Sequence, residues 1–146
     1  MRLIIIATVL VLSTKLTAQQ KYACSSDEIA FYGNDLITYY DGKPVKGNPE
    51  YLLDYEGLKL QFVNKVNLEK FKKDPQKYLP AYGGWCAIAL TSGALVQPDF
   101  NHFKVENGEL MFFEVKAFFN GKTAWEKDPE INKIVADKKF NDIFKE

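Results

Sequence analysis

Cysteine and histidine are scarce in this chain of 146 residues, which has two cysteines, Cys24 and Cys86, and one histidine, His102. Two cysteines are too few for a disulfide scaffold, and one histidine leaves no second imidazole for a typical catalytic zinc site. The sequence also lacks a Cys-x-x-Cys pair, a glycine-rich phosphate loop and a nucleophile at motif spacing from a base. Nothing in it indicates an enzymatic reaction, so we do not expect an enzyme.

An excess of charge of one sign is missing too. The chain balances 19 basic against 19 acidic residues, whereas a nucleic-acid-binding domain carries a basic face. A nucleic-acid partner is therefore not expected. Aromatic residues are plentiful by contrast, with 11 Phe, 8 Tyr and 2 Trp, which is enough for a hydrophobic core in one small domain.

One apolar run stands out, and it lies at the N-terminus. Arg2 precedes the uncharged segment 3–12, and the chain turns polar over 13–18, ending on the small residue Ala18. This layout is typical of a secretory signal peptide, and the run is shorter than the roughly 20 residues of a membrane span. We expect cleavage near Ala18 and export to the periplasm or the medium, with no stable membrane span afterwards. An uncleaved anchor and a buried helix are the alternatives.

The remainder of the chain predicts a single domain of the α+β class. Residues 19–28 are polar and predict a flexible N-terminal arm, and 29–146 form the domain, in which we detect no internal repeat. Runs on either side of Glu56-Gly57 and of Asn107-Gly108 predict two β-hairpins with tight turns. We expect a small antiparallel sheet of hairpins packed with short helices and a C-terminal helical segment. The other expected elements are a strand at 29–32 and helices at 66–73, 118–127 and 130–144.

Five blocks of residues carry a further signal: 35–40, 42–47, 74–78, 82–87 and 125–129. Taken in this order, they resemble the longer, exported members of the YHS domain family. The resemblance implies the α+β fold and a role in binding a metal ion or another small ligand. In short members of the family, a Phe-Cys-Ser turn and a second cysteine precede a helix. The matching positions here hold Val63 and Asn67, so both thiols are absent.

Cys86 follows Gly83 and Gly84, which allow the chain to bend tightly around a ligand or a neighbouring strand. Three interpretations of this cysteine stay open: a buried small hydrophobic residue, a disulfide with Cys24, and a metal ligand or reactive thiol. In the third, His102 and Asp99 are the candidate further ligands, and copper or zinc is the candidate metal, since both accept thiolate and imidazole.

A second candidate site is an aromatic ligand pocket. The aromatic residues in or beside the blocks are Tyr39, Tyr40, Tyr78, Tyr82 and Trp85, and aromatic side chains that line a cleft bind small apolar or ring-bearing molecules. Asp35 is a candidate neighbour, although it also suits the N-cap of a short helical turn. The same aromatic residues would equally serve a hydrophobic core.

Three functional hypotheses follow. The first is a non-catalytic, exported binding domain for a metal ion or small ligand. The second is a thiol-dependent redox or metal-delivery protein centred on Cys86, which requires an accessible thiol of low pKa. The third is a structural module that binds a partner protein, which predicts an inert Cys86 and an exposed apolar patch.

Overall fold

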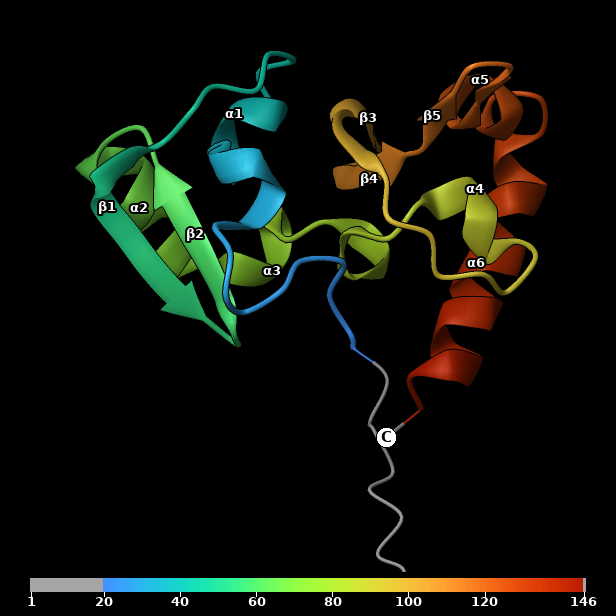
Figure 1. Cartoon of the computed structure of the whole chain (residues 1–146), viewed down its shortest axis with the longest axis horizontal. Helices are drawn as coiled ribbons and strands as arrows, with labels where there is room; N and C mark the ends of the chain where they lie inside the picture. The colour runs from blue at the N-terminus through green and yellow to red at the C-terminus, as the bar shows by residue number, and fades with distance from the viewer. Residues whose placement is uncertain (1–19, 146) are drawn as a thin grey trace, which may run out of the picture.

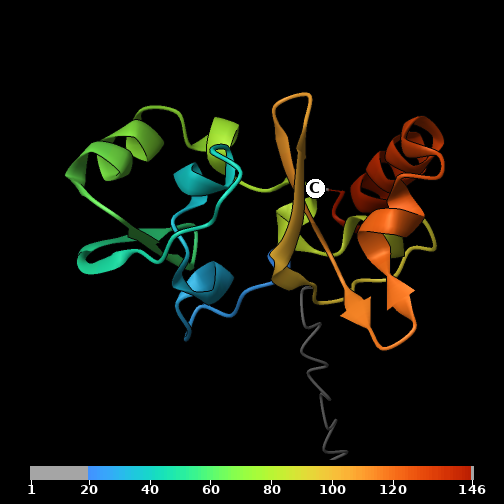
Figure 2. The ribbon, with the colours of Figure 1, turned by 90° about the horizontal axis from the view of Figure 1, so that it is seen from above.

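The computed structural model describes residues 20–145 and shows an α+β protein of two connected halves (Figure 1). The expected fold class is confirmed. The hairpins do not join into one sheet, however: within the described residues the strands form three separate two-stranded antiparallel sheets. Seen from above, the long β3–β4 hairpin stands between the β1–β2 hairpin with its helices and the C-terminal helices (Figure 2).

The first half is built around the β1–β2 hairpin. Its two-residue turn, Glu56-Gly57, has φ values of +48° and +83°, the geometry that matches the twist of the flanking strands. The side chain of Asn64 caps the next helix by accepting from Asn67 N–H at 2.9 Å, as expected. The elements of this half are η1 Ala30–Gly33, α1 Leu36–Tyr39, β1 Asn48–Tyr55, β2 Leu58–Phe62, α2 Lys65–Lys73 and α3 Pro75–Tyr78.

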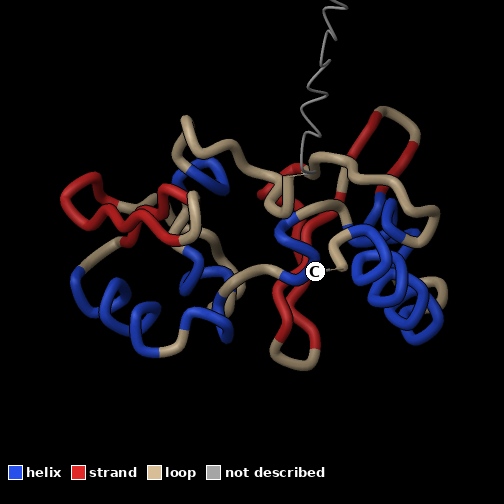
Figure 3. Tube along the Cα trace, turned by 90° about the horizontal axis from the view of Figure 1, so that it is seen from below, coloured by secondary structure: helices blue, strands red, loops and turns tan. Residues whose placement is uncertain are grey.

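The second half contains the β3–β4 hairpin, whose Asn107-Gly108 turn was also predicted correctly. Its last helix starts at Pro129, where proline suits the first helical position. The tube view from below shows this helix beside α5, away from the helices of the first half (Figure 3). The elements are η2 Ala81–Gly84, α4 Ala87–Leu90, β3 Asp99–Glu106, β4 Glu109–Phe113, β5 Val115–Lys116, β6 Phe119–Asn120, α5 Gly121–Trp125 and α6 Pro129–Ile143.

Two of the expected elements are wrong. Residues 29–32 do not form a strand, because Phe31 and Tyr32 adopt φ values of +54° and +58° in the tight left-handed turn η1. The helix expected from residue 118 starts only at Gly121, because Phe119–Asn120 pairs with Val115–Lys116 as a small hairpin. In both segments tertiary packing overrides a weak local preference.

The expectation of a flexible arm at 19–28 is also wrong for the residues that the structure describes. Ala23 N–H donates to the Gly83 carbonyl at 3.0 Å, and Trp85 Nε1–H donates to the Lys21 carbonyl at 3.1 Å. Cys24 is buried in the core of the first half. Because its backbone is hydrogen-bonded to η2 and Ala23 and Cys24 are buried, this segment is an integral part of the fold.

The expected leader, 1–18, with its cleavage site near Ala18, lies outside the described residues. Among residues 20–145, no helix is long and apolar enough to cross a membrane.

Two hydrophobic clusters form the core. The larger joins the halves, because Phe31 and Tyr39 of the first half pack against rings of the β3–β4 hairpin. Phe31 meets Phe100 edge-on at 5.2 Å between ring centroids, and Tyr39 meets Phe112 edge-on at 5.2 Å. The smaller cluster lies in the second half, around Trp125. Aromatic contacts therefore hold the two halves together, and edge-on ring pairs contribute stability beyond the area that they bury.

Candidate functional site

An open hollow of about 610 Å³ lies where α1 of the first half faces β3 of the second. This volume falls in the range of small-molecule sites. Figure 1 shows the two elements on either side of the junction. The residues that line this hollow, which we call the junction groove, are Tyr39, Tyr40, Gly42, Asn101, His102, Phe103, Lys104, Val105 and Lys122.

The Tyr39 side of the groove is rigid. The ring is buried and packs edge-on against Phe103 at 4.9 Å. Its hydroxyl donates to the Phe100 carbonyl at 2.8 Å and accepts from the Asn34 side-chain amide at 3.0 Å. Burial raises the pKa of Tyr39 to about 12, so the hydroxyl stays protonated at neutral pH. Tyr39 therefore serves as a fixed part of the groove and has no role as an acid or base.

His102 and Lys122 stand on the opposite side. The His102 ring nitrogen Nε2 lies 3.1 Å from Asn120 Oδ1, and the same oxygen accepts from Thr123 N–H at 3.1 Å to cap α5. The imidazole is thus tied to the start of the helix that carries Lys122. Within residues 20–145, Lys122 forms no ion pair.

Lys104 is the second cation of the groove, and it is already neutralised. Its ammonium lies 2.9 Å from Glu106 and 3.7 Å from Glu126. The hydrogen bond to Glu106 raises the pKa of Lys104. None of the residues that line the groove is acidic. A half-buried lysine, an imidazole and aromatic rings therefore face this space without a lining carboxylate, which suits an anion with an apolar body.

The sequence-predicted ligand residues are only partly brought together. Tyr39 lines the groove, but Asp35 points into the core beneath α1. Its Oδ1 accepts from Ile37 N–H at 2.8 Å, and its Oδ2 accepts from Val63 N–H at 2.9 Å and from the Asn67 amide at 2.7 Å. The resemblance noted in the sequence would match Val63 and Asn67 to the cysteines of short YHS domains. Here they serve as hydrogen-bond donors to a buried carboxylate, and Asp35 is a satisfied N-cap.

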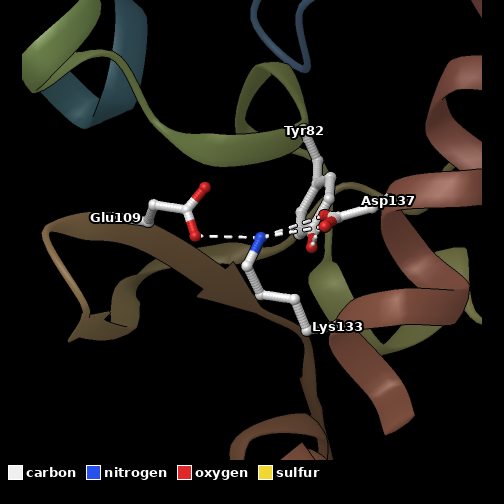
Figure 4. Close-up of polar contacts among 4 residues, drawn as sticks. All are labelled: Tyr82, Glu109, Lys133 and Asp137. Atoms are coloured by element: carbon white, nitrogen blue, oxygen red, sulfur yellow. Dashed lines mark hydrogen bonds and ion pairs between the residues drawn. The ribbon is translucent and has the colours of Figure 1, made fainter. Parts of the chain in front are cut away.

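Tyr82 and Trp85 lie outside the groove as well. The Tyr82 hydroxyl donates to Asp137 Oδ1 at 2.8 Å, and Lys133 bridges Asp137 and Glu109 at 3.1 Å and 2.9 Å (Figure 4). Burial raises the pKa of Tyr82. This cluster fastens η2 and β4 to α6. Trp85 holds the N-terminal segment through Lys21, so both aromatic residues have structural contacts.

The three candidate metal ligands are not assembled into a centre. Cys86 is fully buried at the N-cap of α4, where its Sγ accepts from Glu114 N–H at 3.3 Å. Asp99 Oδ1 accepts from Asn101 N–H at 2.9 Å in the bulge of β3. His102 alone lines the groove. Among the described residues, no group of three or more His, Cys, Asp or Glu side chains could hold a metal ion.

The two cysteines are free and buried. Cys24 Sγ accepts from Phe31 N–H at 3.4 Å, and burial raises its pKa to about 11. Burial raises the pKa of Cys86 as well. No disulfide joins them, so of the three interpretations of Cys86 the structure supports the buried small residue.

Sequence reasoning included Tyr40 in the aromatic set but missed Phe103 and Lys122 as groove residues. Phe103 and Lys122 carry no local motif. They line the groove together with Tyr39 and Tyr40 only because the fold brings β3 and α5 to the junction with α1. No signal in the separate segments marks such a contact.

The fold and the groove define an α+β protein with an open, cationic and aromatic hollow between its two halves. Comparison with known proteins adds no relative, since no family model, no curated protein and no solved structure matches the chain.

Proposed function

We propose that this protein is a non-catalytic, exported binding protein of the YHS type that holds a small anionic ligand with a planar apolar body in the junction groove. The observation that carries the proposal is the composition of the groove. Lys122 faces it without an ion-pair partner among residues 20–145, and no lining side chain is acidic. An anion would find a charge partner there without displacing an existing one.

The apolar part of the ligand follows from the rings. Tyr40 and Phe103 line the groove beside the buried ring of Tyr39. Aromatic side chains favour edge-on or offset contact with a further ring, so a ring-bearing carboxylate fits the groove better than an inorganic ion. A metal ion as ligand is disfavoured, because Lys122 repels cations and the lining offers one imidazole and no carboxylate.

The alternative function centred on Cys86 requires an accessible thiol of low pKa. Cys86 is fully buried and its pKa is raised by that burial. The structure therefore weighs against a redox or metal-delivery role for this residue.

A partner-interaction module remains the second candidate, and one observation favours it. The β5–β6 hairpin exposes three apolar side chains, and Phe118 at its turn is fully exposed. The other two are Val115 and Phe119. Exposed apolar patches of this kind mark interaction sites when they are contiguous.

The direct test is titration of the mature protein with naphthoate, followed by backbone amide chemical shifts in NMR. We expect saturable shifts at Tyr40, His102 and Lys122, and weaker or absent shifts with naphthalenemethanol, which has the same rings without the charge. Lys122→Ala should weaken binding by at least about twofold, the effect of losing a partly exposed charge pair.

Lys65→Ala is the matched control variant. Lys65 is an exposed lysine of α2 outside the groove, so its removal should leave naphthoate binding unchanged. The proposal is wrong if groove amides do not shift with naphthoate up to about 10 mM, beyond the millimolar affinities of weak small ligands. It is equally wrong if Lys65→Ala and Lys122→Ala weaken binding alike.

A further inference from the structure

We infer that the described chain consists of two copies of one structural unit joined end to end, unit one from residue 30 to 80 and unit two from 81 to 145. The two units share few identical residues, and we predicted no repeat from the sequence. The repeat emerges from the backbone conformation and the hydrogen bonds, which recur at a constant spacing of 51 residues up to the end of each long hairpin. Ala30 and Ala81, 51 positions apart, open the two units.

Both units begin with the same unusual turn. In η1, Phe31 and Tyr32 have φ values of +54° and +58°, and in η2 the corresponding Tyr82 and Gly83 have +58° and +60°. Left-handed conformations at residues other than glycine are uncommon. Two consecutive left-handed residues in the same place of each unit therefore make a specific structural signature.

The short helix after each turn is held in the same way. Asp35 is the N-cap of α1, and its Oδ2 accepts from Val63 N–H at 2.9 Å. Cys86, 51 residues later, is the N-cap of α4, and its Sγ accepts from Glu114 N–H at 3.3 Å. Glu114 lies 51 residues after Val63. The Asp35 carboxylate and the Cys86 thiol are thus equivalent acceptors beneath the first short helix of each unit. In both units the donor is the backbone N–H of the residue that follows the second strand of the long hairpin.

The two long hairpins break register at equivalent places. In unit one the pairing moves from Asn48↔Phe62 to Leu52↔Gln61, and in unit two it moves from Asp99↔Phe113 to Phe103↔Phe112. Each of these residues lies 51 positions from its counterpart. A bulge is a specific local feature, so the identical position of both breaks argues for one shared unit.

Each bulge also contains the same short-range hydrogen bond, from a backbone N–H to the side-chain oxygen of the residue two positions earlier. Asn48 Oδ1 accepts from Glu50 N–H at 3.0 Å, and Asp99 Oδ1 accepts from Asn101 N–H at 2.9 Å. The two-residue turns then follow at the same spacing, and both carry a left-handed residue followed by a left-handed glycine, Glu56-Gly57 in one unit and Asn107-Gly108 in the other.

The units diverge directly after the hairpin, by residues 115–119, and again inside the next helix, where unit two has two residues fewer between the Asn cap and the following Asp cap. Asn64 caps α2 immediately after Val63, but Asn120 caps α5 only after the β5–β6 hairpin has intervened. Removing residues 115–119 would join Glu114 to Asn120 just as Val63 joins Asn64. Further on, Phe71-Lys72-Lys73-Asp74-Pro75 corresponds to Trp125-Glu126-Lys127-Asp128-Pro129, with Asp as N-cap and Pro as first helical residue in both.

The repeat explains two features of the chain. First, the β5–β6 hairpin is an insertion that the shared unit does not require. Second, the junction groove is the product of the two units meeting, since α1 belongs to unit one and β3 to unit two. His102 and Lys104 replace Tyr51 and Leu53 of unit one, so the cationic side exists once per chain. If the groove binds a ligand as proposed, a single cationic side means one ligand per chain. This expectation rests on the proposed binding function, whereas the repeat itself does not.

The test is deletion of residues 115–119 from the full mature chain. We expect cooperative thermal unfolding and an unchanged near-ultraviolet circular dichroism spectrum, which reports the packing around Trp125. The reciprocal variant inserts the same five residues between Val63 and Asn64, where the repeat predicts that they are accepted. As a control, the five residues are inserted inside β1 between Leu53 and Asp54, which should abolish cooperative unfolding.

The inference is overturned if the deletion variant and the Val63–Asn64 insertion both lose cooperative unfolding. It is also overturned if the β1 insertion is tolerated as well as the other two, because tolerance would then be unspecific. Cooperative unfolding of either designed variant, with failure of the control, supports it. Naphthoate binding plays no part in this readout, so failure of the proposed function would leave the inference standing.

Discussion

The Tyr82 hydroxyl lies 2.8 Å from Asp137 Oδ1 and connects η2 to α6 across 55 residues of sequence. Lys133 forms ion pairs with the same carboxylate and with Glu109. The elements η2, β4 and α6 therefore meet in one small polar cluster beside the smaller hydrophobic cluster (Figure 4). The position of the C-terminal helix thus depends on a hydrogen bond as well as on apolar contacts.

Tyr82→Phe tests this contact. Asp137 keeps its ion pair with Lys133, so the expected loss of unfolding free energy is about 1 kcal/mol, the usual value for a single hydrogen bond. Urea unfolding monitored by tryptophan fluorescence provides the measurement. Tyr55→Phe is the control, since its exposed hydroxyl only accepts from Gln76 at 3.3 Å. Equal losses in the two variants would mean that the Tyr82 bond carries no specific stability.

Alkaline pH should destabilise the fold through the buried tyrosines. Burial raises the pKa of Tyr39 and of Tyr40 to about 12, against an ordinary value of about 10 in the unfolded chain. The unfolded chain therefore loses these protons first. The stability from the raised pKa values is fully present below about pH 10 and is lost as the pH rises to about 12.

Unfolding free energy measured between about pH 8 and pH 11 checks this. Tyr39→Phe should flatten the decline, because it removes a contribution that reaches about 1 to 1.5 kcal/mol at pH 11, half of the full effect of a two-unit shift. An unchanged slope in Tyr39→Phe would show that this hydroxyl ionises freely in the native state.

Both thiols should be inert in the folded protein. Cys24 and Cys86 are buried, and burial raises both pKa values, that of Cys24 to about 11. A thiol-specific chromogenic reagent should therefore react with neither residue at neutral pH and with both after denaturation. Cys24→Ser and Cys86→Ser assign any reaction to one residue. Rapid modification of Cys86 in the native state would revive the thiol-centred function.

Gly83→Ala should loosen the N-terminal segment. A Cβ at this position would overlap the Lys21 carbonyl oxygen, and φ is +60°. Gly57→Ala shares the left-handed backbone, at +83°, but meets nothing within 4 Å. Gly57→Ala therefore controls for the cost of placing alanine in a left-handed backbone conformation, about 1 kcal/mol. We expect Gly83→Ala to cost more stability and to speed proteolysis after Lys21. Equal behaviour of the two variants would contradict the close packing described for this segment.

The local elements were predictable because their causes are local. The Glu56-Gly57 and Asn107-Gly108 turns, the Asn64 cap and the Pro129 helix start each depend on residues within a few positions of one another. Where an element needs distant contacts, prediction failed. Residues 29–32 form a turn whose Phe31 is buried against rings of the β3–β4 hairpin, and the N-terminal segment is hydrogen-bonded to Gly83 and Trp85.

The candidate site was predictable to a smaller degree. Tyr39, predicted as a ligand residue, and His102, predicted as a metal ligand, do line one groove, but Asp35 and Cys86 proved to be buried acceptors beneath two helices. Nothing in the local sequence distinguishes a carboxylate that binds a ligand from one that accepts three internal hydrogen bonds. That distinction depends on where Val63 N–H and the Asn67 amide lie in space.

The sequence by itself determined the α+β class, the hairpin turns and the helix caps, because these follow from backbone preferences and short-range hydrogen bonds. Only the tertiary structure decided that three sheets stay separate, that both thiols are buried, and that α1 and β3 enclose a groove. The same holds for the two equivalent units, since their likeness resides in φ values and backbone hydrogen bonds that different side chains satisfy equally well.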